Sequence, residues 1–247
     1  MKSKILLLLL FFNLISFSQE IEPLQADRPD QTETPSLVPA GMFQAESGFT
    51  FQKNDAVSTT KTLPSTLWKY GVNKNFEMRL ITEFISQTIN GETIFGLNPI
   101  YIGCKIKITD EQGFLPKTSF IGHILLPKLA STEFKADYFA TKFRFVMQHT
   151  LTKKVSFSYN LGAEWDGFSP VATFIYTVTS GYSFTDQLGA YFELFGFAPQ
   201  NETSNHSLDG GFTYLINNNF MLDLSSGIGI TDNAPKHYFA LGFSFRI

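Results

Sequence analysis

The sequence predicts an all-β protein, a closed antiparallel up-and-down transmembrane β-barrel of about twelve strands. Three observations lead to this fold class. Apolar and polar residues alternate with a period of two from Gly41 to the last residue, as in strands with one apolar and one polar face. Connectors of two lengths follow one another, and charged residues fall on only one face of each predicted strand. The first predicted segment of the chain is an export signal.

Residues 1–18 have the features of a signal peptide. Lys2 and Lys4 form a basic start, Ile5 to Ile15 an apolar core, and Ser16 to Ser18 a small-residue cleavage zone. The apolar core is too short to serve as a membrane anchor, so we expect export and cleavage after Ser18. The single cysteine, Cys104, excludes both an intramolecular disulfide and a lipid-modified residue directly after the signal.

Residues 19–40 are expected to form a periplasmic N-terminal arm. This stretch carries four prolines among polar residues, which indicates extended or irregular backbone. The remaining residues, 41–247, are assigned to the transmembrane barrel. We find no linker and no second domain in the sequence.

Twelve segments have strand patterning and a length sufficient for a tilted strand to cross a bilayer. In the first of them Phe43, Ala45, Phe49 and Phe51 alternate with polar or small residues. The predicted strands are 41–53, 62–72, 76–88, 94–108, 117–128, 138–149, 155–166, 171–184, 187–197, 206–216, 220–230 and 237–247.

The connectors between these strands alternate in length. Short turns are predicted at 73–75, 150–154, 185–186 and 217–219, with 110–116 a longer member of that set. Longer polar loops are predicted at 54–61, 89–93, 129–137, 167–170, 198–205 and 231–236. Short periplasmic turns and longer external loops are typical of outer-membrane barrels, and an even strand number returns both termini to the periplasm.

Each predicted strand keeps its charges off one face. Uncharged apolar faces include Phe76, Met78, Leu80, Phe84; Ile100, Ile102, Ile106; Phe139, Phe143, Phe145; Phe157, Tyr159, Leu161, Trp165; and Phe239, Leu241, Phe243, Phe245. A lipid-facing Arg or Lys at mid-depth costs roughly 2–4 kcal/mol, whereas a lumen side chain meets water or a counter-charge. A secreted soluble β-sandwich, the alternative fold, would reverse the two faces. The 27 Phe and 9 Tyr residues favour the barrel.

The composition and histidine spacing exclude several function classes. A net charge of -3 provides no basic surface for nucleic acid. Barrel hydrolases use a His-x-Ser pair on one strand face, whereas His123, His149, His206 and His237 are each followed two residues later by Leu or Phe. The histidines and the cysteine are too isolated for a metal site, and Cys104 is interpreted as a small apolar filler. We therefore expect neither an enzyme nor a cofactor.

The arm and the last strand resemble parts of known outer-membrane proteins. Phe239, Leu241, Phe243, Phe245 and Ile247 resemble the terminal strand recognised by the barrel-assembly machinery, although that signal usually ends in Phe. Residues 26–35 (ADRPDQTETP), 38–41 (VPAG) and 44–49 (QAESGF) resemble the opening of a family named for the meta pathway of phenol degradation, whose members are labelled transporters. The resemblance covers nearly the whole mature chain, but only Asp27 to Glu33 is specific.

The resemblance implies a barrel that passes small, hydrophobic or aromatic compounds across the outer membrane, and it supplies no catalytic residues. The lumen and permeation candidates are Glu46, Lys69, Arg79, Glu83, Lys105, Lys142, Arg144, Glu164, Glu193, Asp209 and Asp223, with Glu77, Lys107 and Arg246 completing seven acids and seven bases. An equal number of acids and bases disfavours a strongly ion-selective pore. These charges could line a permeation path or form a salt-bridge lattice that fills the barrel.

The arm motif, with Asp27, Arg28, Asp30 and Glu33, could be a plug that inserts among lumen bases such as Arg79 and Arg144, or a disordered leader. The first functional prediction is therefore an outer-membrane transporter or channel for an unidentified small-molecule solute. The alternative is a non-transporting structural or surface-interaction barrel sealed by salt bridges. The expected partners are outer-membrane lipid and the assembly machinery.

Overall fold

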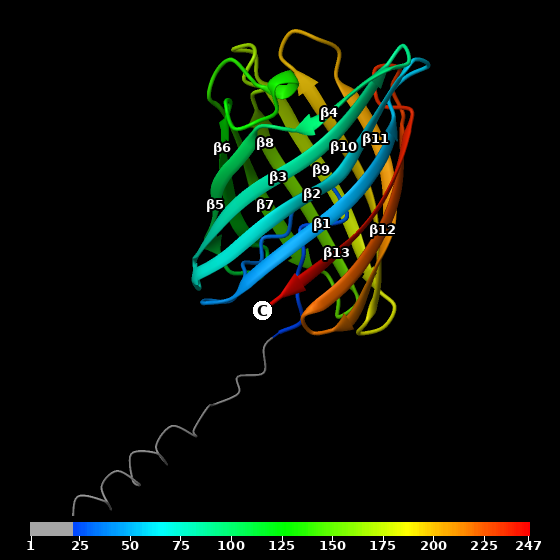
Figure 1. Ribbon diagram of the computed structural model, residues 1–247. Coiled ribbons are helices and arrows are strands. Elements are labelled where there is room, and N and C mark those ends of the chain that lie inside the picture. Colours follow the sequence, from blue (N-terminus) through cyan, green and yellow to red (C-terminus); the bar gives the residue numbers. More distant parts are fainter. Residues whose placement is uncertain (1–21) are drawn as a thin grey trace, which may run out of the picture.

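The computed structural model describes residues 22–247, so the predicted signal peptide lies outside the described residues. The described chain forms thirteen strands and one short 3-10 helix (Figure 1). The strands are β1 (Phe43–Lys53), β2 (Ser58–Asn73), β3 (Phe76–Ile89), β4 (Glu92–Leu97), β5 (Ile100–Thr109), β6 (Lys117–Leu126), β7 (Ala140–Thr150), β8 (Val155–Glu164), β9 (Thr173–Ser183), β10 (Leu188–Pro199), β11 (Asn205–Asn217), β12 (Phe220–Gly229) and β13 (His237–Arg246), with η1 at Thr132–Phe134.

The strands close into one antiparallel barrel with twelve strand positions, as predicted, because β4 and β5 share one position. Consecutive strands pair with each other except β4 and β5, which both pair with β3, and the pairing of β1 with β13 completes the ring. The predicted strand 94–108 is divided into β4 and β5, which pair with the upper and lower parts of β3. The interruption falls at Asn98-Pro99, because proline cannot donate a ladder hydrogen bond.

The connectors divide between the two ends of the barrel. We call the end that carries Ile247 and the turns at 74–75, 151–154, 184–187 and 218–219 the terminal end, and the opposite end the loop end. Three predicted loops are shorter in the structure, and the predicted loop 198–205 spans only 200–204. Residues 58–61 belong to β2, and Asn90-Gly91, with φ angles of 52° and 88°, closes a two-residue hairpin where a longer loop was predicted.

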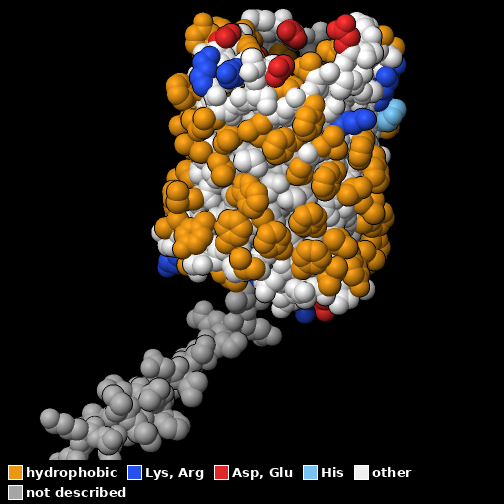
Figure 2. Space-filling view, viewed as in Figure 1, with side chains coloured by type: hydrophobic (Ala, Val, Ile, Leu, Met, Phe, Trp, Pro, Cys, Tyr) orange, Lys and Arg blue, Asp and Glu red, His pale blue; other side chains and the backbone are white. Residues whose placement is uncertain are grey.

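The outer wall is apolar around the middle of the barrel. Leu161 and Phe192 are 55% and 61% exposed, and apolar side chains cover the visible face while charged ones gather towards its rims (Figure 2). Such a continuous apolar surface is suited to hydrocarbon and not to water. No helix among residues 22–247 has the length and apolar character needed to span a membrane.

The barrel interior is polar, and the buried apolar cluster is small. Lys105 and Glu193 are 0% exposed, although charged side chains are normally found at the surface of soluble proteins. The apolar cluster of Leu125, Ala136 and Ala140 lies near the loop end. Trp165, predicted on the lipid face, packs against this cluster because β8 already ends at Glu164 and the chain leaves the strand direction there.

Candidate functional site

The N-terminal arm, residues 22–42 in the described chain, occupies the lumen. It enters at the terminal end, where the backbone N–H of Leu24 donates to the carbonyl of Asn218 over 2.9 Å and Arg246 donates to the carbonyl of Glu22 over 2.7 Å. The dark blue segment in Figure 1 then runs inside the barrel before the chain turns into β1. The position of the arm brings its charged motif among the predicted lumen charges.

Asp27 is the centre of the largest charge cluster. Its carboxylate lies 2.9 Å from Lys69 Nζ, 2.9 Å from Lys105 Nζ and 3.1 Å from Arg79 Nη2. Its backbone N–H donates to Glu46 Oε2 over 2.8 Å, and Glu46 also pairs with Lys69 at 2.6 Å. These groups are buried, so every charge in the cluster depends on an opposite charge beside it.

Three further contacts fasten the middle of the arm to the same side of the barrel. Glu33 pairs with Arg79 Nη2 at 2.7 Å, and Arg144 Nη1 donates to the carbonyl of Gln31 over 2.7 Å. Ser119 Oγ donates to the carbonyl of Pro35 over 2.6 Å. Both of the lumen bases named as partners from the sequence therefore contact the arm.

Arg28 and the residues after Asp30 contact the other side of the lumen. Arg28 donates from Nη2 to Asp223 Oδ1 over 2.9 Å and from Nε to Asp223 Oδ2 over 3.3 Å. Glu193 accepts hydrogen bonds from the backbone N–H of Gln31, at 2.7 Å, and from Thr32 Oγ1. The arm is thus held by its acids on one side and by its one arginine on the other.

The two sides of the lumen carry charges of opposite sign. The basic wall consists of β5, β6 and β7, whose only charged residues are Lys105, Lys107, Lys117, Lys142 and Arg144. The acidic wall consists of β9 to β12, whose only charged residues are Glu193, Asp209 and Asp223. The strand order separates the walls by β8 on one side and by β13, β1, β2 and β3 on the other.

A vestibule near the loop end is lined by three more of the predicted site residues. This cavity of about 630 Å³ is bordered by Glu83, Lys142, Glu164 and Trp165. Lys142 Nζ lies 4.1 Å from the centroid of the Tyr101 ring, a cation–π contact. Glu83 accepts a 2.6 Å hydrogen bond from Asn98 Nδ2, and Lys107 pairs with Asp110 at 2.5 Å towards the terminal end. The structure therefore does not bring all the predicted residues into one cluster.

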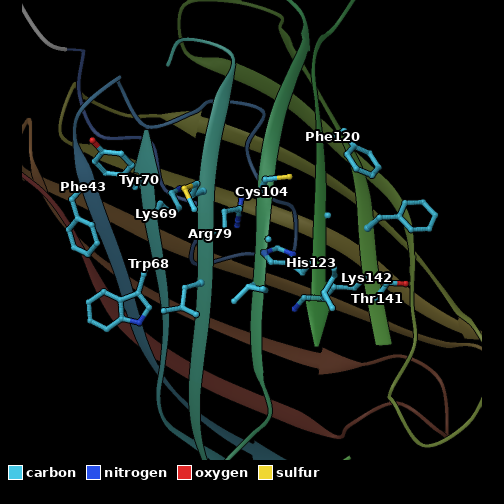
Figure 3. Close-up of a pocket in the computed structure, with 17 residues that line it drawn as sticks. Phe43, Trp68, Lys69, Tyr70, Arg79, Cys104, Phe120, His123, Thr141 and Lys142 are labelled. Carbon is cyan, nitrogen blue, oxygen red and sulfur yellow. The ribbon is translucent and has the colours of Figure 1, made fainter. Parts of the chain in front are cut away.

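A wide groove of about 1000 Å³ lies elsewhere, on the outer wall over β1, β2, β3, β5, β6 and β7. Figure 3 shows labelled residues that line it, with the rings of Phe43, Trp68 and Phe120 on the outward side. Cys104 lies in the same groove, as expected for an apolar filler. Its apolar lining suits lipid chains and places it outside the lumen chemistry.

Several residues that hold the arm were not identified from the sequence. Thr32 Oγ1 lies 2.6 Å from both Thr177 Oγ1 and Thr179 Oγ1, between the arm and β9. The Arg28 guanidinium lies over Gly48 and Gly242, where a Cβ atom on either glycine would collide with it. Gly48 belongs to residues 44–49, which carried the family resemblance, so this resemblance was the one sequence feature that pointed to Gly48.

Comparison with known proteins places the chain in a family. The family model described as "Putative MetA-pathway of phenol degradation" matches residues 26–247. The chain belongs to this family. The match begins at Ala26, so it includes the charged arm motif as well as the barrel. A search of curated proteins finds no match.

Solved structures share the fold at low sequence identity. The chain is similar to an outer-membrane channel from Pseudomonas putida F1, with a TM-score of 0.70 and 9% identity over 90% of this chain and 100% of that one. It is also similar to the KdgM porin (TM-score 0.55, 8% identity, 82% of this chain and 98% of that one). The NanC porin gives a TM-score of 0.52 and 12% identity with the same coverage. At these identities the likeness shows the outer-membrane barrel fold.

Proposed function

We propose that this family member is an outer-membrane channel for small molecules whose resting lumen is closed by the N-terminal arm. The observation that carries the proposal is that the arm crosses the lumen and is bound to both walls, through Asp27 on one side and Arg28 on the other. The channel and porin structures that share the fold support the transport class over an enzyme.

The orientation that fits this proposal puts the terminal end in the periplasm. Export by the predicted signal peptide would deliver the chain there, and the short turns at 74–75 and 218–219 are typical of the periplasmic side. The barrel-assembly machinery would then recognise β13, and outer-membrane lipid would cover the apolar wall. The arm would insert from the periplasm, and the vestibule would face the outside.

The partners of the lumen charges favour a removable plug over a fixed lattice. Inside the lumen, five ion pairs among the described residues join the arm to the wall, whereas only Lys69–Glu46 and Arg79–Glu77 join wall residues to each other. A lattice of strand residues would remain if the arm withdrew. Here withdrawal would remove most of the pairing, so the closed state depends on the arm.

The vestibule is the place where a solute would first bind. Its wall combines the rings of Tyr101, Phe134, Trp165 and Phe168 with polar groups. Aromatic rings with a few polar groups are typical of small-molecule sites. This lining supports the small aromatic or hydrophobic solutes that the family resemblance implies.

A sealed barrel that does not transport is the second candidate function. It is favoured by the burial of the Asp27 cluster, because removing a buried charge from its partners is costly. Such a barrel would serve a structural or surface-interaction role and would contain the same ion pairs.

Conductance across a planar bilayer separates the two functions. The full-length protein is compared with Arg28→Ala and Asp223→Asn, each of which removes the ion pair between the arm and the acidic wall. We expect sparse openings of the native protein and frequent openings of both variants. Folding is checked for each sample by heat-dependent gel migration. Folded native protein and variants that all stay silent, and that release no sugar from liposomes, would exclude the channel and favour the sealed barrel.

A further inference from the structure

Two cavities inside the barrel lie on opposite sides of the same three arm residues. The first, of about 410 Å³, is lined by loop-end residues of the strands, including Gln52 and Tyr238. The second, of about 210 Å³, is lined by terminal-end residues, including Ser183 and Tyr191. Both contain Arg28, Pro29 and Asp30 in their walls. This arm segment, residues 28–30, is therefore the partition between an upper and a lower cavity.

The partition lies against the acidic wall. Glu193 and Asp209 are cross-strand partners on β10 and β11, and Glu193 accepts from the backbone N–H of Gln31, the residue after Asp30, so three carboxyl groups lie near one another. Burial, and then the negative charges of Glu193 and Asp209, raise the pKa of Asp30 above its ordinary value. Arg28 is the one base among arm residues 22–42, and its guanidinium is already paired with Asp223. The strands β9 to β12 contribute no Lys or Arg.

Asp209 is a second, independent indication of a cation path. It is 3% exposed, and its Oδ1 has no hydrogen-bond partner among residues 22–247. Its Oδ2 accepts from the hydroxyl of Tyr238, which lines the upper cavity, and from that of Tyr191, which lines the lower cavity, at 3.3 Å. A buried carboxylate oxygen without a donor is therefore located between the two cavities.

Two bases of the basic wall are held at the arm and do not reach the acidic wall. Lys105 pairs with Asp27, and Arg144 is engaged by the arm carbonyl of Gln31. These contacts lie on either side of the partition in the sequence and need not break when residues 28–30 move. A path that opens along the acidic wall would admit water to these carboxyl groups and remove the burial that favours their neutral form. The ionised carboxylates would then attract cations and repel anions.

Arg28 is also positioned to keep this path closed. Its side chain lies in a notch over Gly48 and Gly242, which are cross-strand partners on β1 and β13. The three atoms nearest to a Cβ built on Gly48 all belong to the Arg28 guanidinium. A methyl group at this position would displace Arg28 from Asp223 without changing any charge.

We infer that the open channel selects for positive charge, so that it conducts inorganic cations and, among the small aromatic or hydrophobic solutes, the amines. The route follows the acidic wall through the partition at residues 28–30, and Arg28 leaving Asp223 opens it. This inference rests on the proposed channel function and names the route and the charge class of its solutes. The equal number of acids and bases in the sequence conceals this selectivity because the two signs occupy separate walls.

Reversal potentials in a KCl gradient test the inference in reconstituted full-length protein. Gly48→Ala serves as the open form, and Asp209→Asn and Glu193→Gln are added to it separately. We expect K⁺ to permeate in preference to Cl⁻, choline to carry current when it replaces K⁺, and each neutralisation to lower the K⁺/Cl⁻ permeability ratio about threefold, the effect of one charge a few ångströms from an ion in a wet pore. Glu92→Gln, an exposed residue of β4, provides the same charge change outside the route.

The outcomes separate the inference from the proposed function. Open variants that show no cation preference, or a preference that Asp209→Asn and Glu193→Gln leave unchanged, would overturn the cation route while the channel stands. If Gly48→Ala stays closed and Arg28→Ala opens, the neutralisations are made in Arg28→Ala with the same expectation. Silence of every folded variant would overturn both the route and the channel.

Discussion

Arg28 and Asp223, 195 residues apart in the sequence, form a two-pronged ion pair between the arm and the acidic wall. Bidentate pairs of arginine with carboxylate are stronger and more directional than single contacts. The Arg28 side chain is 19% exposed, whereas the side chains that surround Asp27 are almost fully buried. Because water reaches Arg28, its ion pair is easier to break than those of Asp27, and we expect the arm to open there first.

The notch under Arg28 gives the first prediction. Gly48→Ala should raise the open probability of the channel several-fold while thermal stability changes little, because the new methyl group collides only with the flexible end of Arg28. Single-channel recording provides the measurement. Gly122→Ala is the matched control, since its Cβ would approach the Phe120 ring at 3.3 Å. Equal open probabilities for the two variants would show that the space over Gly48 does not hold Arg28 in its closing position.

Neutralising Asp27 should weaken the whole arm. Asp27→Asn leaves Lys69, Arg79 and Lys105 without their shared carboxylate, and breaking a buried ion pair by removing one partner costs about 3–5 kcal/mol. We expect a lower midpoint in guanidinium unfolding and a larger mean conductance. Asp186→Asn, in an exposed turn, should match the native protein in both measurements. A normal midpoint for Asp27→Asn would mean that the cluster does not stabilise the closed state.

The same cluster predicts how the closed state responds to acid. Burial alone would raise the pKa of Asp27, but the positive charges of Lys105, Lys69 and Arg79 outweigh it and hold the pKa well below the ordinary value. A depressed carboxyl pKa contributes stability that is present above the unfolded-state pKa of about 3.9 and is lost as the pH falls through the lower folded-state value.

Conductance tests this behaviour when it is recorded from neutral pH down to pH values below the pKa of an aspartate in the unfolded chain. We expect the arm to stay bound down to about pH 4 and to release only below it. Glu46 accepts the backbone N–H of Asp27 and faces the same cluster, so Glu46→Gln is recorded in parallel. Opening of the native channel in mildly acidic solution would show that these bases do not control the arm.

The hydroxyl of Thr32 gives a further prediction. It contacts Thr177, Thr179 and Glu193, so Thr32→Val keeps the shape of the side chain but removes a hydrogen bond to a charged group, which contributes about 1.5–3 kcal/mol. We expect faster amide hydrogen exchange across the arm, measured by mass spectrometry on peptides that cover residues 22–42. Thr93→Val, which removes an exposed hydroxyl pair with Thr88, should leave that exchange unchanged. Similar exchange in both variants would contradict the role given to Thr32.

The barrel itself could be predicted from local patterns. Side chains alternate between the two faces of a strand, so a one-residue shift would turn Lys105 towards lipid and Ile106 towards the lumen. Only one register keeps Lys105 in the polar lumen and Ile106 against lipid. The predicted strands at 76–88 and 220–230 therefore agree closely with β3 and β12. Trp165 was misplaced because alternation was extended one residue beyond the end of β8.

The sequence by itself determined the closed barrel and the side chains that face its lumen, because the pleat of a strand converts a pattern of neighbouring residues into two faces. Only the tertiary structure decided which lumen residues meet. Asp27 reaches Lys105 and Arg28 reaches Asp223 because closure of the ring and entry of the arm bring distant strands around one segment. A count of seven acids and seven bases is the same for mixed and for separated charges, so the position of each strand in the ring was needed to reveal a basic and an acidic wall.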